Sequence, residues 1–220
     1  MKGVMFRGEP LIDREEEIAY IKEWFEKIPK EILFLYGPKS TGKTTIIEYI
    51  VENELFNDFK IFKSDKYEVK YVNFRQKLFG GYDTFLSSML IKQEKGFDLS
   101  AQINLGVFQI DATSYRKIKD KELDLFDELF KQLKESKKKP ILIFDEIQEL
   151  EDIYIDRERL LLNEFLNFCV RLTKETHLAN VVLLSSNTIF LNKLYNNAKL
   201  KVTSTFYKIA HLEYETMKEC

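Results

Sequence analysis

Cysteine and histidine are scarce in this chain of 220 residues, which has two of each. Cys169 lies inside an amphipathic pattern and Cys220 is the last residue, so neither a disulfide framework nor a cysteine metal site has enough ligands. His177 and His211 have no second histidine, cysteine or carboxylate at metal-binding spacing, which argues against a zinc site. This composition fits a protein of the reducing cytoplasm.

Long hydrophobic runs are also absent from the sequence. The longest apolar stretches are short, as in residues 32–36 and 141–144, and the N-terminal segment MKGVMFRGEP lacks the apolar stretch of a signal peptide. The sequence therefore predicts neither a transmembrane nor a secreted protein, and no membrane partner is expected.

The chain has little excess charge of either sign. Its formal charge is −2, which gives no overall electrostatic attraction to nucleic acid or to an anionic membrane. The basic run at residues 134–139 ends a predicted helix, where positive charge suits the helix dipole. Most of the 18 Phe and 11 Tyr fall on predicted core faces, so stacking on bases has little support. Nucleic acid is not supported as a partner by this chain.

What the sequence does contain is enough apolar material for one domain with a sizeable core, at 45% apolar and 32% charged residues over positions 1–220. Asp13 and Glu16 form a capping-box pattern that predicts the start of the first helix, and Pro29 ends that pattern. The predicted helices are 13–28, 43–56, a segment around 85–90, 121–135 and 157–176, with another beginning near Thr188. The predicted strands are 31–36, 69–74, 141–144, 180–185 and 205–212.

Strands that alternate with helices predict an α/β fold with a parallel sheet of about five strands, covered by helices on both faces. Residues 1–29 are read as an N-terminal box and helix, and residues 30–212 as the core of the domain. Between these regular elements, alternating apolar residues from Leu99 to Val107 predict a β insertion near 95–115.

The strongest functional signal is the segment that follows the first buried strand. It fits the pattern G-x-x-x-x-G-K-[ST], in which consecutive backbone N–H groups and the start of the next helix surround a phosphate. Lys43 would neutralise the β- and γ-phosphates, and the Thr44 hydroxyl would bind Mg²⁺. Lys39 is also read as a solvated loop residue. The candidate nucleotide-binding residues of this segment are Gly37, Pro38, Lys39, Ser40, Thr41, Gly42, Lys43, Thr44 and Thr45.

Two adjacent carboxylates end the buried strand at 141–144. Asp145 and Glu146 are expected at the carboxyl edge of the sheet, where open α/β folds bind their ligands. Asp145 would hold Mg²⁺ through water, and Glu146 would accept a proton from the attacking water. An acidic helix start is the structural alternative. Gln148 is interpreted as a residue that faces solvent, with orientation of the water as the alternative.

Polar side chains also follow the buried strand at 180–185. Ser185, Ser186 and Asn187 could cap the helix that begins near Thr188, which is the commonest use of such residues. They could instead reach the γ-phosphate or the attacking water if this strand lies between the other two. The residues alone leave both readings open.

Taken together, these motifs resemble the archaeal ATPase family, a branch of the P-loop NTPases allied to AAA+ and STAND proteins, over about Leu11 to Leu212. The segments that carry the resemblance are LIDREEE (11–17), LYGPKSTGKTT (35–45), LIFDEIQEL (142–150), RLTKETH (171–177), VVLLSSN (181–187) and LKVTSTFYKI (200–209).

This resemblance implies a three-layer P-loop NTPase fold with strand order 5-1-4-3-2. That order places Ser185 and Ser186 between the phosphate loop and Asp145 and favours a sensor role, slightly more for Ser186. Leu11 and Ile12 match the apolar positions that cover the adenine ring in such ATPases. A hydrophobic staple at the first helix is a compatible reading of the same two residues.

The sequence departs from the family pattern in two ways. Related ATPases usually continue into a helical lid and often a winged-helix module, whereas this sequence ends about eight residues after its last predicted strand, so neither module is assigned and the chain is either a short member or a fragment. The window that usually holds an arginine finger contains only lysines, namely Lys193, Lys199 and Lys201. A cation would have to come from Arg159 or Arg171 of a neighbouring molecule, although both also suit surface ion pairs.

The sequence thus predicts an ATP-binding, Mg²⁺-dependent ATPase that is slow in isolation and accelerates with a protein partner or self-association. A non-catalytic ATP-dependent switch is the first alternative and a small-molecule kinase the second. A GTPase is disfavoured because residues 192–195 lack the Asp of a guanine-recognition motif.

Overall fold

The computed structural model describes residues 4–55, 64–75, 80–90, 108, 110–196 and 198–211. Its centre is a parallel sheet in the order β4-β5-β6-β3-β7. The strands are β3 (Ile32–Tyr36), β4 (Tyr67–Asn73), β5 (Lys139–Asp145), β6 (Asn180–Ser185) and β7 (Ser204–Lys208). Counted from β3, this is the order 2-3-4-1-5, so the predicted α/β architecture and strand order are confirmed.

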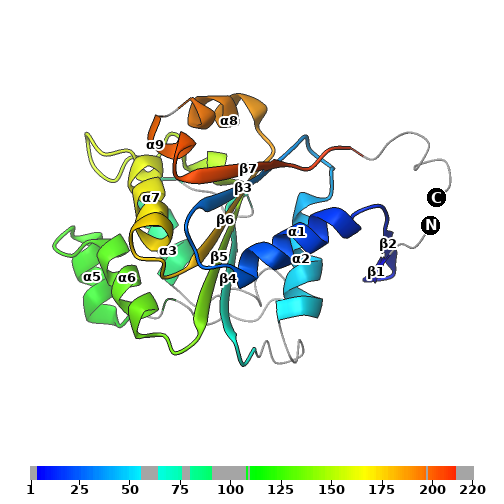
Figure 1. The fold of residues 1–220 in the computed structure, drawn as a ribbon. Helices are drawn as coiled ribbons and strands as arrows, with labels where there is room; N and C mark the ends of the chain where they lie inside the picture. Colours follow the sequence, from blue (N-terminus) through cyan, green and yellow to red (C-terminus); the bar gives the residue numbers. More distant parts are fainter. Residues whose placement is uncertain are drawn as a thin grey trace.

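Helices cover both faces of the sheet (Figure 1). The helices are α1 (Glu15–Glu26), α2 (Lys43–Ile50), α3 (Tyr82–Leu90), α5 (Ala112–Lys119), α6 (Leu125–Glu135), α7 (Leu161–Val170), α8 (Thr188–Tyr195) and α9 (Ala198–Lys201). α1 and α2 lie on one face, and α3, α5, α6 and α7 lie on the other.

The alternation of side chains along each strand explains these two layers. In β3, Ile32 and Phe34 belong to the core cluster shared with α6 and α7, whereas Leu33 and Leu35 belong to the cluster shared with α1 and α2. Both faces of a central parallel strand must be apolar, because each is covered by helices. Within the described residues, no helix is long and apolar enough to cross a membrane.

The register of the strands aligns their carboxyl ends. Asn73 is paired with Asp145 across β4 and β5, and Tyr36 with Ser185 across β3 and β6. The polar residues that follow these strands therefore meet at one edge of the sheet, which is where parallel sheets bind ligands.

The capping box predicted at the first helix is wrong. Asp13 has a positive φ of 53°, and Arg14 is the residue at the cap position, with no side-chain cap hydrogen bond. The helix begins at Glu15 and ends at Glu26, inside the predicted 13–28. Three acidic residues in its first turn complement the helix dipole in place of a cap.

The predicted helix at 157–176 starts late. α7 begins at Leu161 and continues from Arg171 to Glu175 as a π-helical turn. The Asp156 carboxylate accepts hydrogen bonds from the backbone N–H groups of Glu158 and Arg159, which offers this segment a turn in place of a helix.

Several further elements were not predicted. A short antiparallel pair precedes α1, formed by β1 (Val4–Phe6) and β2 (Glu9–Leu11). Helix α5 is capped by the Asp111 side chain, so the predicted β insertion at 95–115 is wrong over residues 112–115. The remainder of that predicted insertion lies largely outside the described residues.

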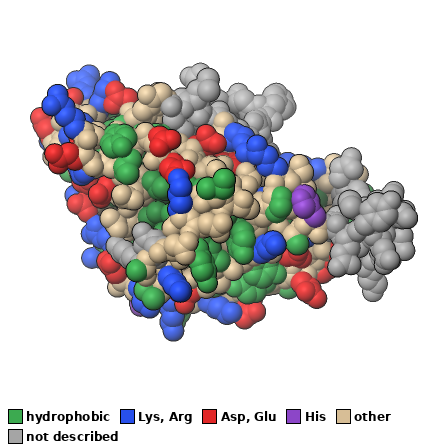
Figure 2. Space-filling view, turned by 90° about the horizontal axis from the view of Figure 1, so that it is seen from above, with side chains coloured by type: hydrophobic (Ala, Val, Ile, Leu, Met, Phe, Trp, Pro, Cys, Tyr) green, Lys and Arg blue, Asp and Glu red, His purple; other side chains and the backbone are tan. Residues whose placement is uncertain are grey.

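Acidic and basic side chains are interspersed on the face shown in Figure 2, with hydrophobic side chains between them. In the described part of this face, basic side chains do not form a continuous patch.

Candidate active site

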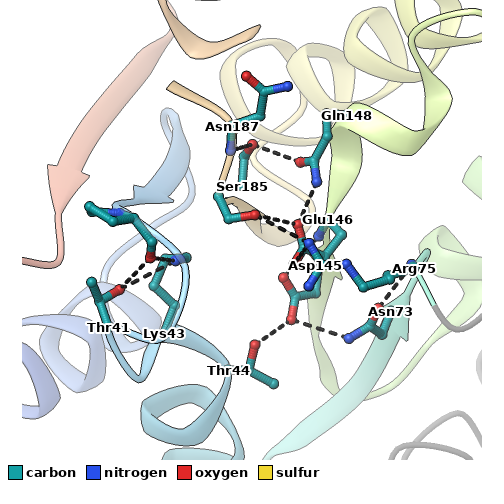
Figure 3. Close-up of polar contacts among 12 residues, drawn as sticks. Thr41, Lys43, Thr44, Asn73, Arg75, Asp145, Glu146, Gln148, Ser185 and Asn187 are labelled. Atoms are coloured by element: carbon teal, nitrogen blue, oxygen red, sulfur yellow. Dashed lines mark hydrogen bonds and ion pairs between the residues drawn. The ribbon is translucent and has the colours of Figure 1, made fainter. Parts of the chain in front are cut away.

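The segment from Gly37 to Gly42 joins β3 to α2 and curls around the Lys43 side chain (Figure 3). Ser40 and Gly42 have positive φ values of 64° and 81°, so the turn needs one non-glycine residue in the left-handed region. Lys43 is buried, and its Nζ donates hydrogen bonds to the carbonyl oxygens of Gly37 at 2.9 Å and Pro38 at 2.7 Å. The lysine therefore lies inside the loop that the sequence motif predicts.

Burial lowers the pKa of Lys43, because the charged ammonium is partly removed from water. The carboxylates of Glu146 and Asp145 oppose this shift, since negative charge favours the protonated amine. A cation held among carbonyls and facing two acids is well placed to meet an anionic ligand.

The other loop residues differ in exposure. Thr41 is buried and its hydroxyl donates to the Pro38 carbonyl at 3.1 Å, which braces the turn. The side chains of Lys39, Ser40 and Thr45 are exposed. Lys39 and Ser40 therefore contribute only backbone to the curled loop, as the prediction of a solvated Lys39 anticipates, and Thr45 belongs to the first turn of α2.

Thr44 and Asp145 meet across 101 positions of sequence. The Thr44 hydroxyl donates to Asp145 Oδ2 at 2.7 Å, and the same oxygen accepts from the Tyr71 hydroxyl at 3.1 Å and the Asn73 amide at 3.4 Å. Burial raises the pKa of the Asp145 carboxyl, and the hydrogen bond from Thr44 opposes that shift. The structure thus brings the two residues that the sequence assigns to Mg²⁺ into direct contact, and their role in binding the metal stays a prediction.

The chemistry of this pair fits Mg²⁺. A threonine hydroxyl and an aspartate carboxylate are hard oxygen donors, and Mg²⁺ in nucleotide sites uses one or two such protein groups together with water and phosphate oxygens. No group of three or more His, Cys, Asp or Glu side chains suited to a metal occurs among the described residues, so a dedicated all-protein metal cage is absent there.

Glu146 occupies a strained position at the end of β5. Its φ of 57° and ψ of 47° place it in the left-handed region, which is uncommon for a residue with a long side chain. Its carboxylate forms an ion pair with Arg75 at 2.8 Å and accepts a hydrogen bond from the Ser186 hydroxyl at 3.0 Å. This left-handed backbone conformation directs the Glu146 carboxylate toward the residues at the ends of the two neighbouring strands (Figure 3).

Gln148 belongs to this network, so the solvent-facing interpretation is wrong. Its side chain is half-buried, and its amide nitrogen donates to Glu146 while its Oε1 accepts from the Ser185 hydroxyl at 2.7 Å. The short helical turn Ile147–Leu150 brings Gln148 back over Glu146. This contact depends on the turn geometry, which the residue pattern does not specify.

The three polar residues at the end of β6 have different partners, so the two roles predicted for them fall to different residues. Asn187 caps α8, since its side chain accepts from the N–H groups of Ile189 and Phe190 at 3.1 Å each. Ser185 is fully buried and bonds Gln148, whereas Ser186 bonds Glu146. Because β6 lies between β3 and β5, both serines are between the phosphate loop and the acids.

Sequence reasoning missed Arg75. It follows β4 and reaches both Glu146 and the Ser186 hydroxyl, the second at 3.4 Å. A signal was available, since Asn73 and Arg75 are polar residues at the end of a strand, where chemistry-bearing residues of α/β folds gather. Their use depends on β4 being the neighbour of β5.

The predicted adenine-covering residues lie at the entry to α1. Leu11 is buried in the same core cluster as Ile18 and Ile209, and Ile12 is partly exposed. This arrangement is compatible with the staple at α1, and the adenine role of both residues stays a prediction.

The residues considered as arginine fingers form ion pairs within their own chain. Arg159 pairs with Asp156 at 2.7 Å, and Arg171 pairs with Asp127 at 2.5 Å while lying over the Phe130 ring. Among the lysines, Lys193 pairs with Glu151 and Lys201 lies 5.9 Å from the Tyr195 ring. The Lys199 side chain lies outside the described residues.

The fold and the loop define a P-loop ATPase domain. A family model described as an ATPase domain predominantly from Archaea matches residues 11–220, and the chain belongs to that family.

Curated relatives support the same assignment. Two ATP-binding proteins of Methanocaldococcus jannaschii are 36% and 34% identical over 94% of this chain, and the matches cover 59% and 60% of those proteins. An ATP-binding protein of Pyrococcus horikoshii is 30% identical over 92% of the chain. The chain thus spans about three fifths of the length of the curated relatives it matches.

Solved structures share the fold. The Walker-type ATPase of Pyrococcus abyssi matches with a TM-score of 0.57 at 15% identity, over 100% of this chain and 59% of that one. The Aeropyrum pernix ORC1 protein in complex with DNA matches with a TM-score of 0.57 at 17% identity, over 94% of this chain and 47% of that one. At this identity the likeness concerns the fold alone.

Proposed function

We propose that this domain binds ATP together with Mg²⁺ and hydrolyses it to ADP and phosphate. The observation that carries the proposal is the placement of Asp145 and Glu146 opposite the loop that holds Lys43, with Thr44 already bonded to Asp145. Membership of an archaeal ATPase family supports the same conclusion.

Each part of the site has a role in this reaction. The loop amides and Lys43 bind and orient the phosphates, and this positioning is the main contribution of P-loop proteins to phosphoryl transfer. Thr44 and Asp145 would hold Mg²⁺, which would offset the negative charge of the phosphates. Glu146 accepts the proton of a water whose oxygen attacks the γ-phosphorus, while the bond from that phosphorus to the leaving ADP oxygen breaks.

The residues around Glu146 position its carboxylate. Ser186 and Gln148 both donate to Glu146, and Ser185 holds Gln148 from the other side. We assign Ser186 and Ser185 to the recognition of the γ-phosphate or of the attacking water. Ser186 contacts Glu146 directly, whereas Ser185 reaches it only through Gln148.

The engagement of Glu146 favours one alternative, a non-catalytic ATP-dependent switch. The carboxylate has three side-chain partners, so a base that is never released would leave ATP bound but intact. A cytoplasmic location, a protein partner and self-association remain proposals from the sequence.

Two substitutions test the proposal. Lys43→Ala should abolish ATP binding in calorimetry, because the phosphates lose the cation of the loop. Lys131→Ala, on the surface of α6, is the matched control and should bind as the parent does. An unchanged Mg-ATP affinity in Lys43→Ala would show that this loop does not bind phosphate.

The second substitution separates an enzyme from a switch. Glu146→Gln keeps the side-chain shape but removes the proton acceptor, so it should bind ATP and stop its hydrolysis. A parent that binds ATP tightly without turnover would support the switch. Transfer of phosphate from ATP to a metabolite would instead identify a kinase.

A further inference from the structure

The guanidinium of Arg14 joins three separate parts of the chain. Arg14 lies at the entry to α1 with 6% of its surface exposed. It pairs with Glu17 at 2.6 Å, donates to the carbonyl oxygen of Thr41 at 3.1 Å and donates to that of Ala210 at 2.8 Å. One buried cation thus contacts α1, the phosphate loop and the backbone beyond β7.

The contact with Thr41 fixes the orientation of one peptide in the loop. In a trans peptide the C=O and N–H groups point in opposite directions, and no cis peptide occurs among the described residues. Because Arg14 binds the Thr41 carbonyl oxygen, the N–H of Gly42 points away from Arg14. Inward N–H groups are what such a loop offers to a phosphate.

The contact with Ala210 connects the loop to the backbone that leaves β7. Ile209 N–H donates to the Tyr36 carbonyl at 2.6 Å, and a Cβ added to Gly37 would lie 2.0 Å from the Ile209 carbonyl oxygen. The backbone at 209–210 therefore contacts the start of the phosphate loop directly. It is connected to the other end of the loop, at Thr41, through the side chain of Arg14. Figure 1 shows the chain leaving β7 beside the connection from β3 to α2.

We propose that Arg14 is a positioning residue that holds the Thr41–Gly42 peptide in its phosphate-binding orientation and couples the loop to the backbone at 209–210. This inference rests on the proposed ATP binding. Its consequence is that nucleotide in the loop orders the chain where it leaves β7, and that the coupling requires the planar guanidinium fork.

Arg14→Lys and Glu17→Gln separate this role from a merely structural one. The lysine keeps a positive charge near Glu17 but replaces the fork with a single ammonium, which is a poor substitute at a site with several fixed acceptors. Glu17→Gln removes the ion pair but leaves the contacts of Arg14 with both carbonyls. Arg116→Lys, exposed on α5, is the matched control.

The first measurement is calorimetry with Mg-ATP on variants whose thermal unfolding shows that they are folded. Arg14→Lys should weaken the affinity about tenfold or more, since hydrogen bonds from a charged donor are lost. Glu17→Gln and Arg116→Lys should stay within about threefold of the parent. An Arg14→Lys variant that binds as the parent does, or a Glu17→Gln variant with the same loss, would overturn the proposal.

The second measurement is amide hydrogen exchange, with and without Mg-ATP. In the parent, Mg-ATP should slow exchange in fragments covering 37–45 and 207–211, and in Arg14→Lys the slowing at 207–211 should disappear. Equal slowing at 207–211 in both proteins would refute the coupling.

If the parent does not bind Mg-ATP, the proposed function fails and exchange in the free proteins still tests Arg14. Faster exchange at 41–43 in Arg14→Lys would then support the positioning role, and unchanged exchange would contradict it.

Discussion

The Arg75 guanidinium lies 2.8 Å from the carboxylate of Glu146, although 71 positions of sequence separate the two residues. The ion pair crosses from the end of β4 to the end of β5, and the hydroxyl of Ser186, the residue after β6, contacts both side chains. A carboxylate engaged in this way must be released before it can take a proton from water. Arg75 is therefore placed to restrain the proposed base.

Arg75→Ala should raise the ATP turnover of the isolated domain about two- to fivefold. The size of the effect is limited because the Arg75 side chain is 49% exposed, and ion pairs with an exposed partner contribute only about 0–1 kcal/mol. Steady-state phosphate release at saturating Mg-ATP measures the change, with Arg116→Ala as the control. A fall of more than tenfold would mean that Arg75 instead stabilises charge in the transition state.

The sequence predicted the strands and their parallel arrangement, because these depend on apolar patterning along the chain. Arg75 and Arg14 escaped prediction for a different reason. Their partners lie far away in sequence, and the contacts exist only because β4 neighbours β5 and because the chain beyond β7 passes the phosphate loop.

The misplaced start of α7 has a local cause. Apolar spacing continues through the segment before Leu161, but the Asp156 side chain binds the backbone N–H groups there and stabilises a turn. A side chain that competes for backbone groups can override periodicity over a few residues.

Asp145→Asn should remove the effect of Mg²⁺ on ATP affinity. The amide keeps an oxygen that can accept from the Thr44 hydroxyl, but it lacks the charge that binds the metal. Calorimetry with and without Mg²⁺ tests this, and Asp83→Asn on the surface of α3 is the control. The melting temperature should fall modestly, because both Asp145 oxygens accept hydrogen bonds and the asparagine amide replaces one of them with a donor. A variant that keeps the full magnesium dependence would exclude Asp145 as a ligand.

Gly37→Ala should destabilise the domain and weaken ATP binding. An added Cβ would lie 2.0 Å from the Ile209 carbonyl oxygen, so the backbone must shift, and overpacking of this kind costs about 1–3 kcal/mol. Gly80→Ala provides the control, since nothing lies within 4 Å of its added Cβ. Urea unfolding of both variants measures the difference. Equal stability would show that the backbone at Ile209 can move to accommodate the added Cβ without a cost in free energy.

ATP turnover by the isolated domain should be well below the median enzyme rate of ~10 per second. An arginine that stabilises the transition state is worth about 10³–10⁵ in rate, and Arg159 and Arg171 are each bound to an acid of their own chain. Exposed pairs of this kind cost about 0–1 kcal/mol to break, so either arginine remains available to a neighbouring molecule.

Specific activity should therefore rise with protein concentration, and Arg159→Ala or Arg171→Ala should remove that rise while leaving the rate of dilute protein within about twofold. Phosphate release measured from dilute to concentrated protein tests both statements. Fast turnover that is independent of concentration and indifferent to both substitutions would show that the domain completes its own site, because no cation from a neighbour would then be needed.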